Sequence, residues 1–111
     1  MVIRRRLKYG NIKVEFDGHK FDSKREANRY IYLKSLEKKR VIEKLAIHPE
    51  FVLEVKGMII CKYIADFSYF SDGKFIVEDV KSKFTKKIST YRLKKKLLLA
   101  LYNIEITEID T

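Results

Sequence analysis

Cysteine, histidine and glycine are scarce in this sequence, and each shortage excludes a class of function. Cys61 is the only cysteine, so neither an internal disulfide nor a cysteine-based zinc site is available. The two histidines are too few for a nuclease site that needs several histidine ligands. No glycine-rich phosphate loop occurs, so we expect no nucleotide cofactor.

Long apolar runs are missing as well. No apolar stretch approaches the ~20 residues that are needed to cross a bilayer. The arginines of "MVIRRRLKYG" are not followed by the apolar segment of a secretory signal. With the single cysteine, these observations favour a reducing, cytoplasmic compartment and no membrane insertion.

Basic residues, by contrast, are in large excess. Lys and Arg number 25 against 15 Asp and Glu, a net charge of +10. Such an excess first indicates a polyanionic partner, of which nucleic acid is the commonest. An anionic membrane surface is the alternative, but it requires an amphipathic or lipidated segment.

The length of 111 residues and the 46% apolar content predict one domain over residues 1–111, with residues 1–10 as a flexible basic arm. In the first half, the pattern predicts a hairpin around Asp17-Gly18, a helix to about residue 39, and an extended segment 41–55 that is broken at His48-Pro49. In the second half, it predicts strands 58–70 and 74–81 and a loop 82–90. A helix capped by Ser89 or Thr90 and a strand 104–110 follow. We therefore expect an α/β fold: a single mixed sheet with antiparallel central strands flanked by two helices, plus an N-terminal β-hairpin.

Charged residues interrupt two apolar strands on either side of Asp72-Gly73. If that turn has two residues, Asp66 lies opposite Asp79, and Lys81 projects from the same face as Asp79. Facing carboxylates repel each other. Lys81 supplies one positive charge, and Mg²⁺, which prefers oxygen ligands and keeps waters and substrate phosphates, would supply the rest.

Two alternatives stay open at this point. A three-residue turn would place Asp66 opposite Glu78 instead of Asp79, and Asp79 with Lys81 could simply form a solvated strand face. Glu26 also has two interpretations, because with Ser23 it matches a capping box at the start of the first helix.

The carboxylate pattern resembles the two-strand motif of the PD-(D/E)xK nuclease superfamily. "YIADF" supplies the first acid as Asp66, and "VEDVK" supplies the (D/E)xK element as Asp79-Val80-Lys81. Glu26 in "FDSKREANRY" matches the glutamate that many members contribute from the preceding helix. Small phage-encoded members are more similar still, since "KYGN", "FDSKREA", "ADF", "VEDVK" and "YRLKKKL" occur in this order over residues 8–97.

The resemblance implies a restriction-endonuclease-like core and a catalytic set of Glu26, Asp66, Asp79 and Lys81. It implies one or two Mg²⁺ ions, or Mn²⁺, held by Asp66, Asp79, Glu26 and the carbonyl of Val80. Lys81 would orient the attacking water.

The sequence departs from the superfamily pattern at two positions. Ala65 replaces the proline of the eponymous motif, a variation that the superfamily tolerates. Glu78, next to Asp79, could be the second acid instead. Asp79 is favoured because it is two residues from Lys81 and therefore lies on the same face of the strand.

The segment 81–96 is rich in Lys and Arg and contains no acid. Part of such a run is a solvated helix face, but its position next to the proposed site places positive charge where a phosphate backbone would lie. The candidates for contact with the DNA backbone are Lys83, Lys86, Lys87, Arg92, Lys94 and Lys95, with Arg4, Arg5 and Arg6 as a possible arm.

These observations predict a Mg²⁺-dependent DNA endonuclease that resides in the cytoplasm, or in the host cytoplasm if phage-encoded. A homodimer is expected if both strands of a duplex are cut. The alternatives are a structure-selective nuclease such as a Holliday-junction resolvase, a non-catalytic nucleic-acid-binding protein on the same fold, and a basic interaction module. The last of these leaves Asp66 opposite Asp79 unexplained.

Overall fold

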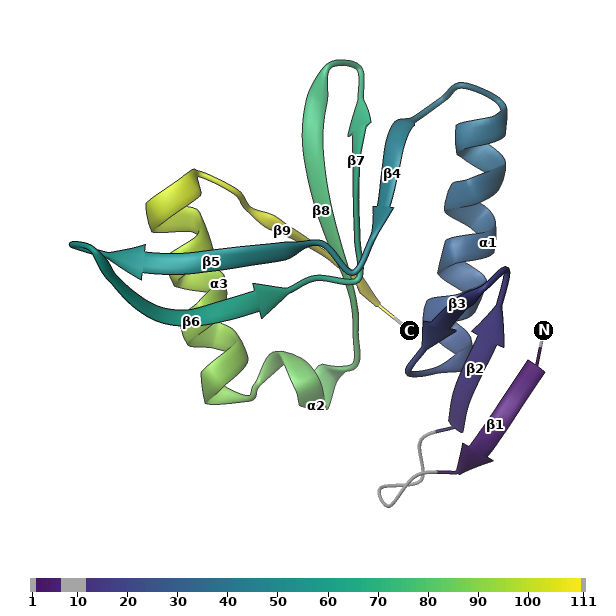
Figure 1. Cartoon of the computed structure of the whole chain (residues 1–111), viewed down its shortest axis with the longest axis horizontal. Helices are drawn as coiled ribbons and strands as arrows, with labels where there is room; N and C mark the ends of the chain where they lie inside the picture. Colours follow the sequence, from purple (N-terminus) through teal and green to yellow (C-terminus); the bar gives the residue numbers. More distant parts are fainter. Residues whose placement is uncertain (1, 7–11, 111) are drawn as a thin grey trace.

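The computed structural model describes residues 2–6 and 12–110 (Figure 1). The elements are β1 Val2–Arg6, β2 Ile12–Phe16, β3 His19–Phe21, α1 Lys24–Lys38, β4 Glu43–Ile47, β5 Glu50–Val55, β6 Met58–Ile64, β7 Phe67–Ser71, β8 Lys74–Lys81, α2 Lys83–Lys86, α3 Ser89–Tyr102 and β9 Ile106–Asp110. The fold is mixed α/β, as predicted. No helix in this described part of the chain is long and apolar enough to cross a membrane.

The central sheet has the strand order β4-β7-β8-β9. Its first three strands are antiparallel and β9 runs parallel to β8, so the mixed sheet with antiparallel central strands is confirmed. The prediction of a single sheet was wrong, because β1-β2-β3 and β5-β6 form sheets of their own. In Figure 1, α1 and β1–β3 lie on one side of β4, β7 and β8, and α3 with the β5–β6 hairpin lies on the other.

Two-residue turns set the register of the hairpins. Asp17 and Gly18 both have positive φ, and so do Asp72 and Gly73, as type I′ turns require. Ser71 pairs with Lys74, and Phe67 pairs with Glu78. This register is the one expected from a two-residue turn, and the three-residue alternative is excluded.

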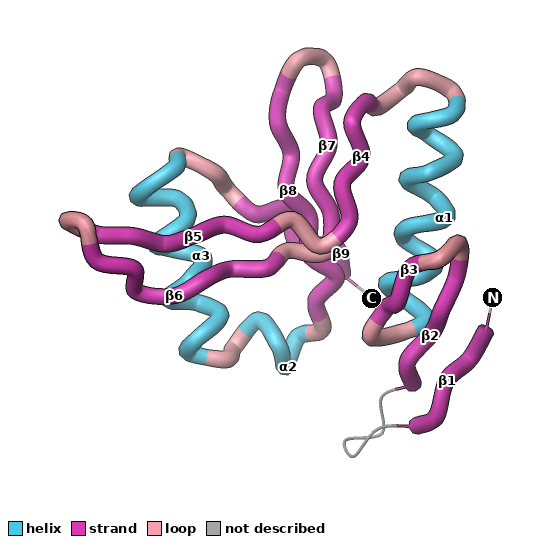
Figure 2. Tube along the Cα trace, viewed as in Figure 1, coloured by secondary structure: helices cyan, strands magenta, loops and turns pink. Residues whose placement is uncertain are grey.

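Two predictions about strands were wrong. Val2–Arg6, expected in a flexible arm, form β1 and pair with β2; the rest of residues 1–10 lies outside the described chain. The strand expected over residues 58–70 is split at Ala65-Asp66, beside the break at His48-Pro49 (Figure 2). The two breaks are hydrogen-bonded to each other, from His48 N–H to Asp66 O at 2.9 Å and from Ala65 N–H to Pro49 O at 3.0 Å.

The helices also differ from the expectation of two. The predicted loop 82–90 contains the short helix α2, and α3 has Ile88 as its N-cap residue rather than Ser89 or Thr90. Leu98 and Tyr91 are the buried residues of α3, whereas Leu93 is 57% exposed. The spacing predicts Leu93, Leu97, Ala100 and Leu101 as the core side, but Leu93, Ala100 and Leu101 are exposed, because "LLLALY" places apolar residues on every side of the helix.

Apolar clusters pack on both faces of the central sheet. One joins α1 and the N-terminal strands to Phe67 and Tyr69 of β7, and the other joins α3 and the β5–β6 hairpin to Val77 of β8. Alternate residues of β8 therefore face opposite ways, so Val77 and Asp79 face α3 whereas Glu78 faces α1.

Glu78 is held in a buried ion pair on the α1 side. It is 1% exposed, and Arg29 donates two hydrogen bonds to its carboxylate at 2.8 and 2.7 Å. The Tyr69 hydroxyl donates a further hydrogen bond to it. These contacts account for Glu78 as an acid that attaches α1 to the sheet, and they leave Asp79 as the acid on the face of Lys81.

We predict that Arg29→Leu lowers the free energy of unfolding by about 3 kcal/mol or more, because it leaves the Glu78 carboxylate buried without its cation. Replacing both residues by leucine should recover part of this loss. Urea denaturation measures each change. Arg92→Leu, at an exposed arginine of α3, is the matched control and should change stability by less than about 0.5 kcal/mol. An equally small effect of Arg29→Leu would contradict the structural role.

Candidate metal centre

Three possible metal ligands converge where α1 begins and the two strand breaks meet. Glu26 lies in the first turn of α1, His48 at the β4–β5 break and Asp66 at the β6–β7 break. One ligand atom from each residue lies within 4.8 Å of the other two. Glu26 Oε1 and His48 Nε2 lie 2.8 Å apart.

Glu26 is directed into this cluster by the cap of its helix. The Ser23 hydroxyl accepts a hydrogen bond from the Glu26 N–H at 3.2 Å, so the predicted N-cap is confirmed. The Glu26 carboxylate itself contacts His48 and is almost completely buried, with 5% exposure. The cap role of Ser23 and the site position of Glu26 are therefore both present.

Asp66 is fixed through its main chain and its side chain. Its N–H donates to Asp79 Oδ1 at 2.8 Å, and its Oδ2 accepts from the Val80 N–H at 2.7 Å. The main-chain N–H of Asp66 therefore links the two acids. Val80 contributes its N–H to this arrangement, and its carbonyl as a metal ligand stays a prediction.

Asp79 and Lys81 project from one face of β8, as predicted from their parity. Asp79 is 1% exposed, and its Oδ2 is buried without a hydrogen-bond partner. The Lys81 ammonium lies 3.8 Å from that oxygen and 4.7 Å from the centre of the Tyr91 ring. Lys81 is thus held between the second acid and an aromatic ring of α3.

The structure therefore brings only some of the predicted site residues into one cluster. Glu26 and Asp66 share one cluster, whereas Asp79 is joined to it through Asp66. His48 was not among the predicted site residues, and the structure places it among the possible ligands. A signal existed in the sequence, since His48-Pro49 breaks a strand, but nothing in the sequence indicated that this break pairs with the one at Asp66.

An open cavity of about 310 Å³ leads to the cluster. Its lining includes Glu26, Asp66, Lys81 and, from the start of α2, Ser82 and Thr85. The cavity could admit a phosphate group to the two acids that line it.

Burial dominates the electrostatics of the three acids. It raises the pKa of Glu26 to about 7, with the charge of Asp66 as the next contribution. It raises the pKa of Asp79 to about 6 against the opposing effect of Lys81. It also raises the pKa of Asp66, although the hydrogen bond from Val80 opposes this. A cation bound among these acids would offset the cost of their ionisation.

The donor set fits a divalent metal. Two carboxylates suit Mg²⁺ or Mn²⁺, and the imidazole favours a transition metal such as Mn²⁺ over Mg²⁺. The unpartnered Oδ2 of Asp79 is a further buried oxygen that could accept a cation or a metal-bound water.

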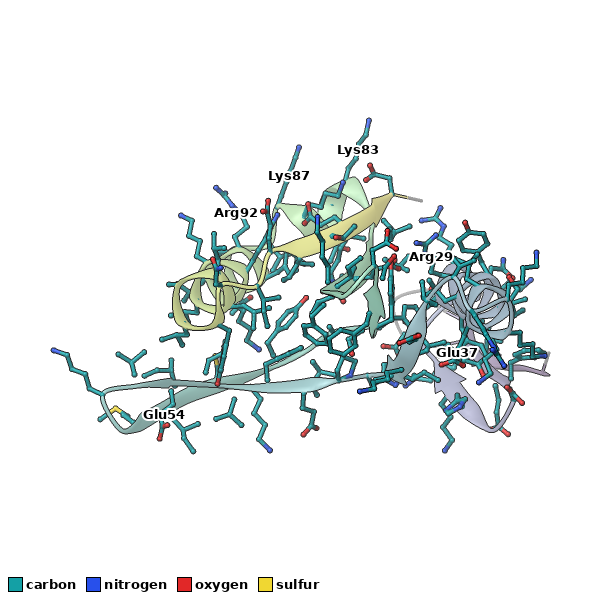
Figure 3. All side chains as sticks on the ribbon, turned by 90° about the horizontal axis from the view of Figure 1, so that it is seen from above. Arg29, Glu37, Glu54, Lys83, Lys87 and Arg92 are labelled. Carbon is teal, nitrogen blue, oxygen red and sulfur yellow. The ribbon has the colours of Figure 1, made fainter. Side chains whose placement is uncertain are left out.

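The predicted DNA-contacting residues fall into three groups. Lys83, Lys87 and Arg92 are exposed and project from one side of the molecule (Figure 3). Lys86 contacts Asp110, and Lys95 lies 3.2 Å from Glu108, so these two cations are partly neutralised. Lys94 is half-buried and faces a separate pocket beside β6.

The raised pKa values predict that the metal-free protein loses stability as pH rises. The folded-state pKa values of Glu26 and Asp79 exceed their ordinary values of 4.5 and 3.8. The folded chain therefore binds these protons more tightly than the unfolded chain, and the resulting stability is lost as pH rises toward about 7. In EDTA, the melting temperature should fall by several degrees between about pH 5 and about pH 7.5.

The variant Glu26→Gln tests this assignment, because it removes the acid whose folded-state pKa is raised to about 7. Its melting temperature should depend less on pH than that of the unmodified protein. Stability that is flat or rises over the same interval would contradict the predicted electrostatics.

Comparison with known proteins places the chain in a family. Residues 6–109 match a family model described as "Protein of unknown function (DUF1064)". No curated protein and no solved structure matches the chain. Because the match covers almost the whole sequence, the protein belongs to the DUF1064 family.

Proposed function

We propose that this protein is a metal-dependent endonuclease that hydrolyses phosphodiester bonds in DNA. The observation that carries the proposal is the cluster of Glu26, His48 and Asp66 beside the Asp79–Lys81 pair, at a cavity next to exposed cations. Membership of the PD-(D/E)xK superfamily and a restriction-endonuclease-like core are parts of the same proposal. Both parts are supported by the order of the sequence motifs. They are also supported by the order of α1, the antiparallel β7–β8 hairpin and β9, which pairs with β8 in parallel.

Each residue has a defined task in this proposal. Glu26, His48 and Asp66 hold the ion, with Asp79 and the Val80 carbonyl available as further oxygen ligands. A bound Mg²⁺ or Mn²⁺ supplies an acidified water and stabilises the charge on the attacking and leaving oxygens. Lys81 orients that water or the scissile phosphate, and its contact with Tyr91 limits where its ammonium can lie.

The exposed cations support a DNA backbone as the ligand. Lys83 and Lys87 lie at either end of α2, the helix whose first residues border the cavity. With Arg92 they project in one direction, so one DNA strand could contact all three (Figure 3). Such contacts position a duplex and do not read its bases.

A homodimer in the cytoplasm completes the proposal. One chain has one such cluster among its described residues, so simultaneous cleavage of both strands would use two chains. Met58, Ile59 and Ile60 leave β6 with an exposed apolar surface that a second copy could cover.

We predict Mg²⁺- or Mn²⁺-dependent cleavage of DNA that EDTA abolishes. Asp66→Asn and Asp79→Asn should each lower the rate by more than ~100-fold, since even residues outside the first ligand shell cost 10–100-fold. Gel assays on plasmid, linear and four-way-junction DNA provide the measurement, and strong preference for the junction would identify a resolvase.

The matched control is Asp72→Asn, the same change in an exposed turn whose backbone conformation asparagine tolerates. It should leave cleavage unchanged. Cleavage that survives both site substitutions would show that the chemistry lies elsewhere. Binding without cleavage on every substrate would favour the non-catalytic DNA-binding alternative.

With His48 among the ligands, the proposed site should bind Mn²⁺ in preference to Mg²⁺. We expect Mn²⁺ to raise the melting temperature at pH 7.5 more than Mg²⁺ at equal concentration, because the imidazole nitrogen binds Mn²⁺ better. His48→Ala should weaken Mn²⁺ binding by ~10-fold or more and remove the difference between the ions. Thermal shift titrations measure this without activity. His19→Ala, at the other histidine of the chain, is the control, and an unchanged Mn²⁺ response in His48→Ala would exclude His48 as a ligand.

A further inference from the structure

A second pocket lies between β6 and the first turns of α3. Its volume is about 320 Å³, and Lys62, Tyr63, Thr90, Tyr91 and Lys94 are among its lining residues. Tyr91 connects it to the proposed site, because its ring also contacts the Lys81 ammonium at 4.7 Å. We call this the β6–α3 pocket.

The charge of the β6–α3 pocket is wholly positive. Lys62 comes from β6 and Lys94 from α3, and no acidic residue lines the pocket with them. Within the described residues, neither ammonium has an ion-pair partner, which contrasts with Lys86 and Lys95 nearby. Two unneutralised cations that face one pocket repel each other, and an anion bound between them would attract both.

The start of α3 adds hydrogen-bond donors to the same pocket. Its N-cap residue, Ile88, offers no side-chain acceptor. The first intrahelical hydrogen bond runs from Arg92 N–H to Ile88 O at 3.0 Å. The N–H groups of residues 89–91 precede that bond and are left for an external acceptor, as at other helix N-termini that bind phosphate.

The Tyr63 hydroxyl is an independent indication of a missing acceptor. Tyr63 is 4% exposed, and its hydroxyl is buried without a hydrogen-bond partner. A buried hydroxyl in this state destabilises the fold. A ligand oxygen in the pocket that Tyr63 lines would satisfy it.

We propose that the β6–α3 pocket binds a phosphate group. Lys62 and Lys94 supply the charge, and the first turn of α3 and Tyr63 supply neutral donors. This inference extends the proposed nuclease function, which it takes as its premise for the source of the phosphate. Ile64 lines the pocket only two residues before Asp66, so we assign the bound group to a DNA phosphate near the cleaved one.

Titration of the metal-free protein with inorganic phosphate, followed by ¹⁵N–¹H NMR, tests the pocket without DNA. We expect saturable shifts of the amides of residues 89–91. In Lys62→Ala/Lys94→Ala these shifts should be lost. Lys20→Ala/Lys74→Ala, which removes the same charge from exposed strand positions, should retain them. Absent shifts, or equal losses in both double variants, would overturn the proposal.

Tyr63→Phe separates binding from packing. Removing an unpartnered buried hydroxyl should leave the melting temperature unchanged or raise it. Phosphate affinity should nevertheless fall several-fold, because a donor to the ligand is lost. Unchanged affinity in this variant would remove Tyr63 from the site.

DNA then tests the link to the proposed function. In EDTA, with Asp66→Asn as the background, adding Lys62→Ala/Lys94→Ala should weaken oligonucleotide binding several-fold and lower the salt dependence by about one phosphate contact. The Lys20→Ala/Lys74→Ala pair should change both quantities less. If inorganic phosphate binds but DNA affinity is unaffected, the pocket binds phosphate and its place on the DNA path is wrong. If phosphate binding is intact and the unmodified protein cuts no DNA, the nuclease proposal fails and the phosphate site stands.

Discussion

The arrangement around Asp66 is the constraint on which the rest of the structure depends. Its N–H binds the side chain of Asp79, its carbonyl accepts from His48, and its carboxylate accepts from Val80. These contacts join β8 and the β4–β5 break to the point where the β5–β6 hairpin leaves the central sheet. A strand that continued straight through Asp66 could not make them. The interruption of the strand is therefore what allows one residue to orient the site.

The sequence predicted those parts of this arrangement that depend on local pattern. The Asp72-Gly73 turn sets the register, and the register with the parity of Lys81 selects Asp79 over Glu78. The N-cap at Ser23 is equally local and was equally predictable. Turn conformation and strand alternation depend on only a few neighbouring residues. The features that they determine can therefore be inferred without knowledge of tertiary contacts.

The features that the sequence did not predict all depend on contacts between distant segments. His48 joins the cluster only because two strand breaks, at Pro49 and at Ala65, are hydrogen-bonded to each other. The rotation of α3 depends on which of its several apolar sides meets Val77 and Leu53. The separation of β5–β6 from the central sheet follows from the same pair of breaks. Alternation identifies strands, but it does not identify which sheet each strand joins.

The energetic balance of the site argues for a cationic ligand rather than for a structural role of its acids. Glu78 shows how this fold treats a structural acid: Arg29 and Tyr69 satisfy its carboxylate from two sides. Asp79, the next residue, is equally buried, yet one of its oxygens has only a lysine at 3.8 Å and no hydrogen bond. Burial raises the pKa of Asp79 and of Glu26, so the metal-free fold is less stable when both are charged. A protein that needed these acids only for packing would be more stable with neutral residues in their place. Their presence next to an open cavity supports the proposed binding of a cation.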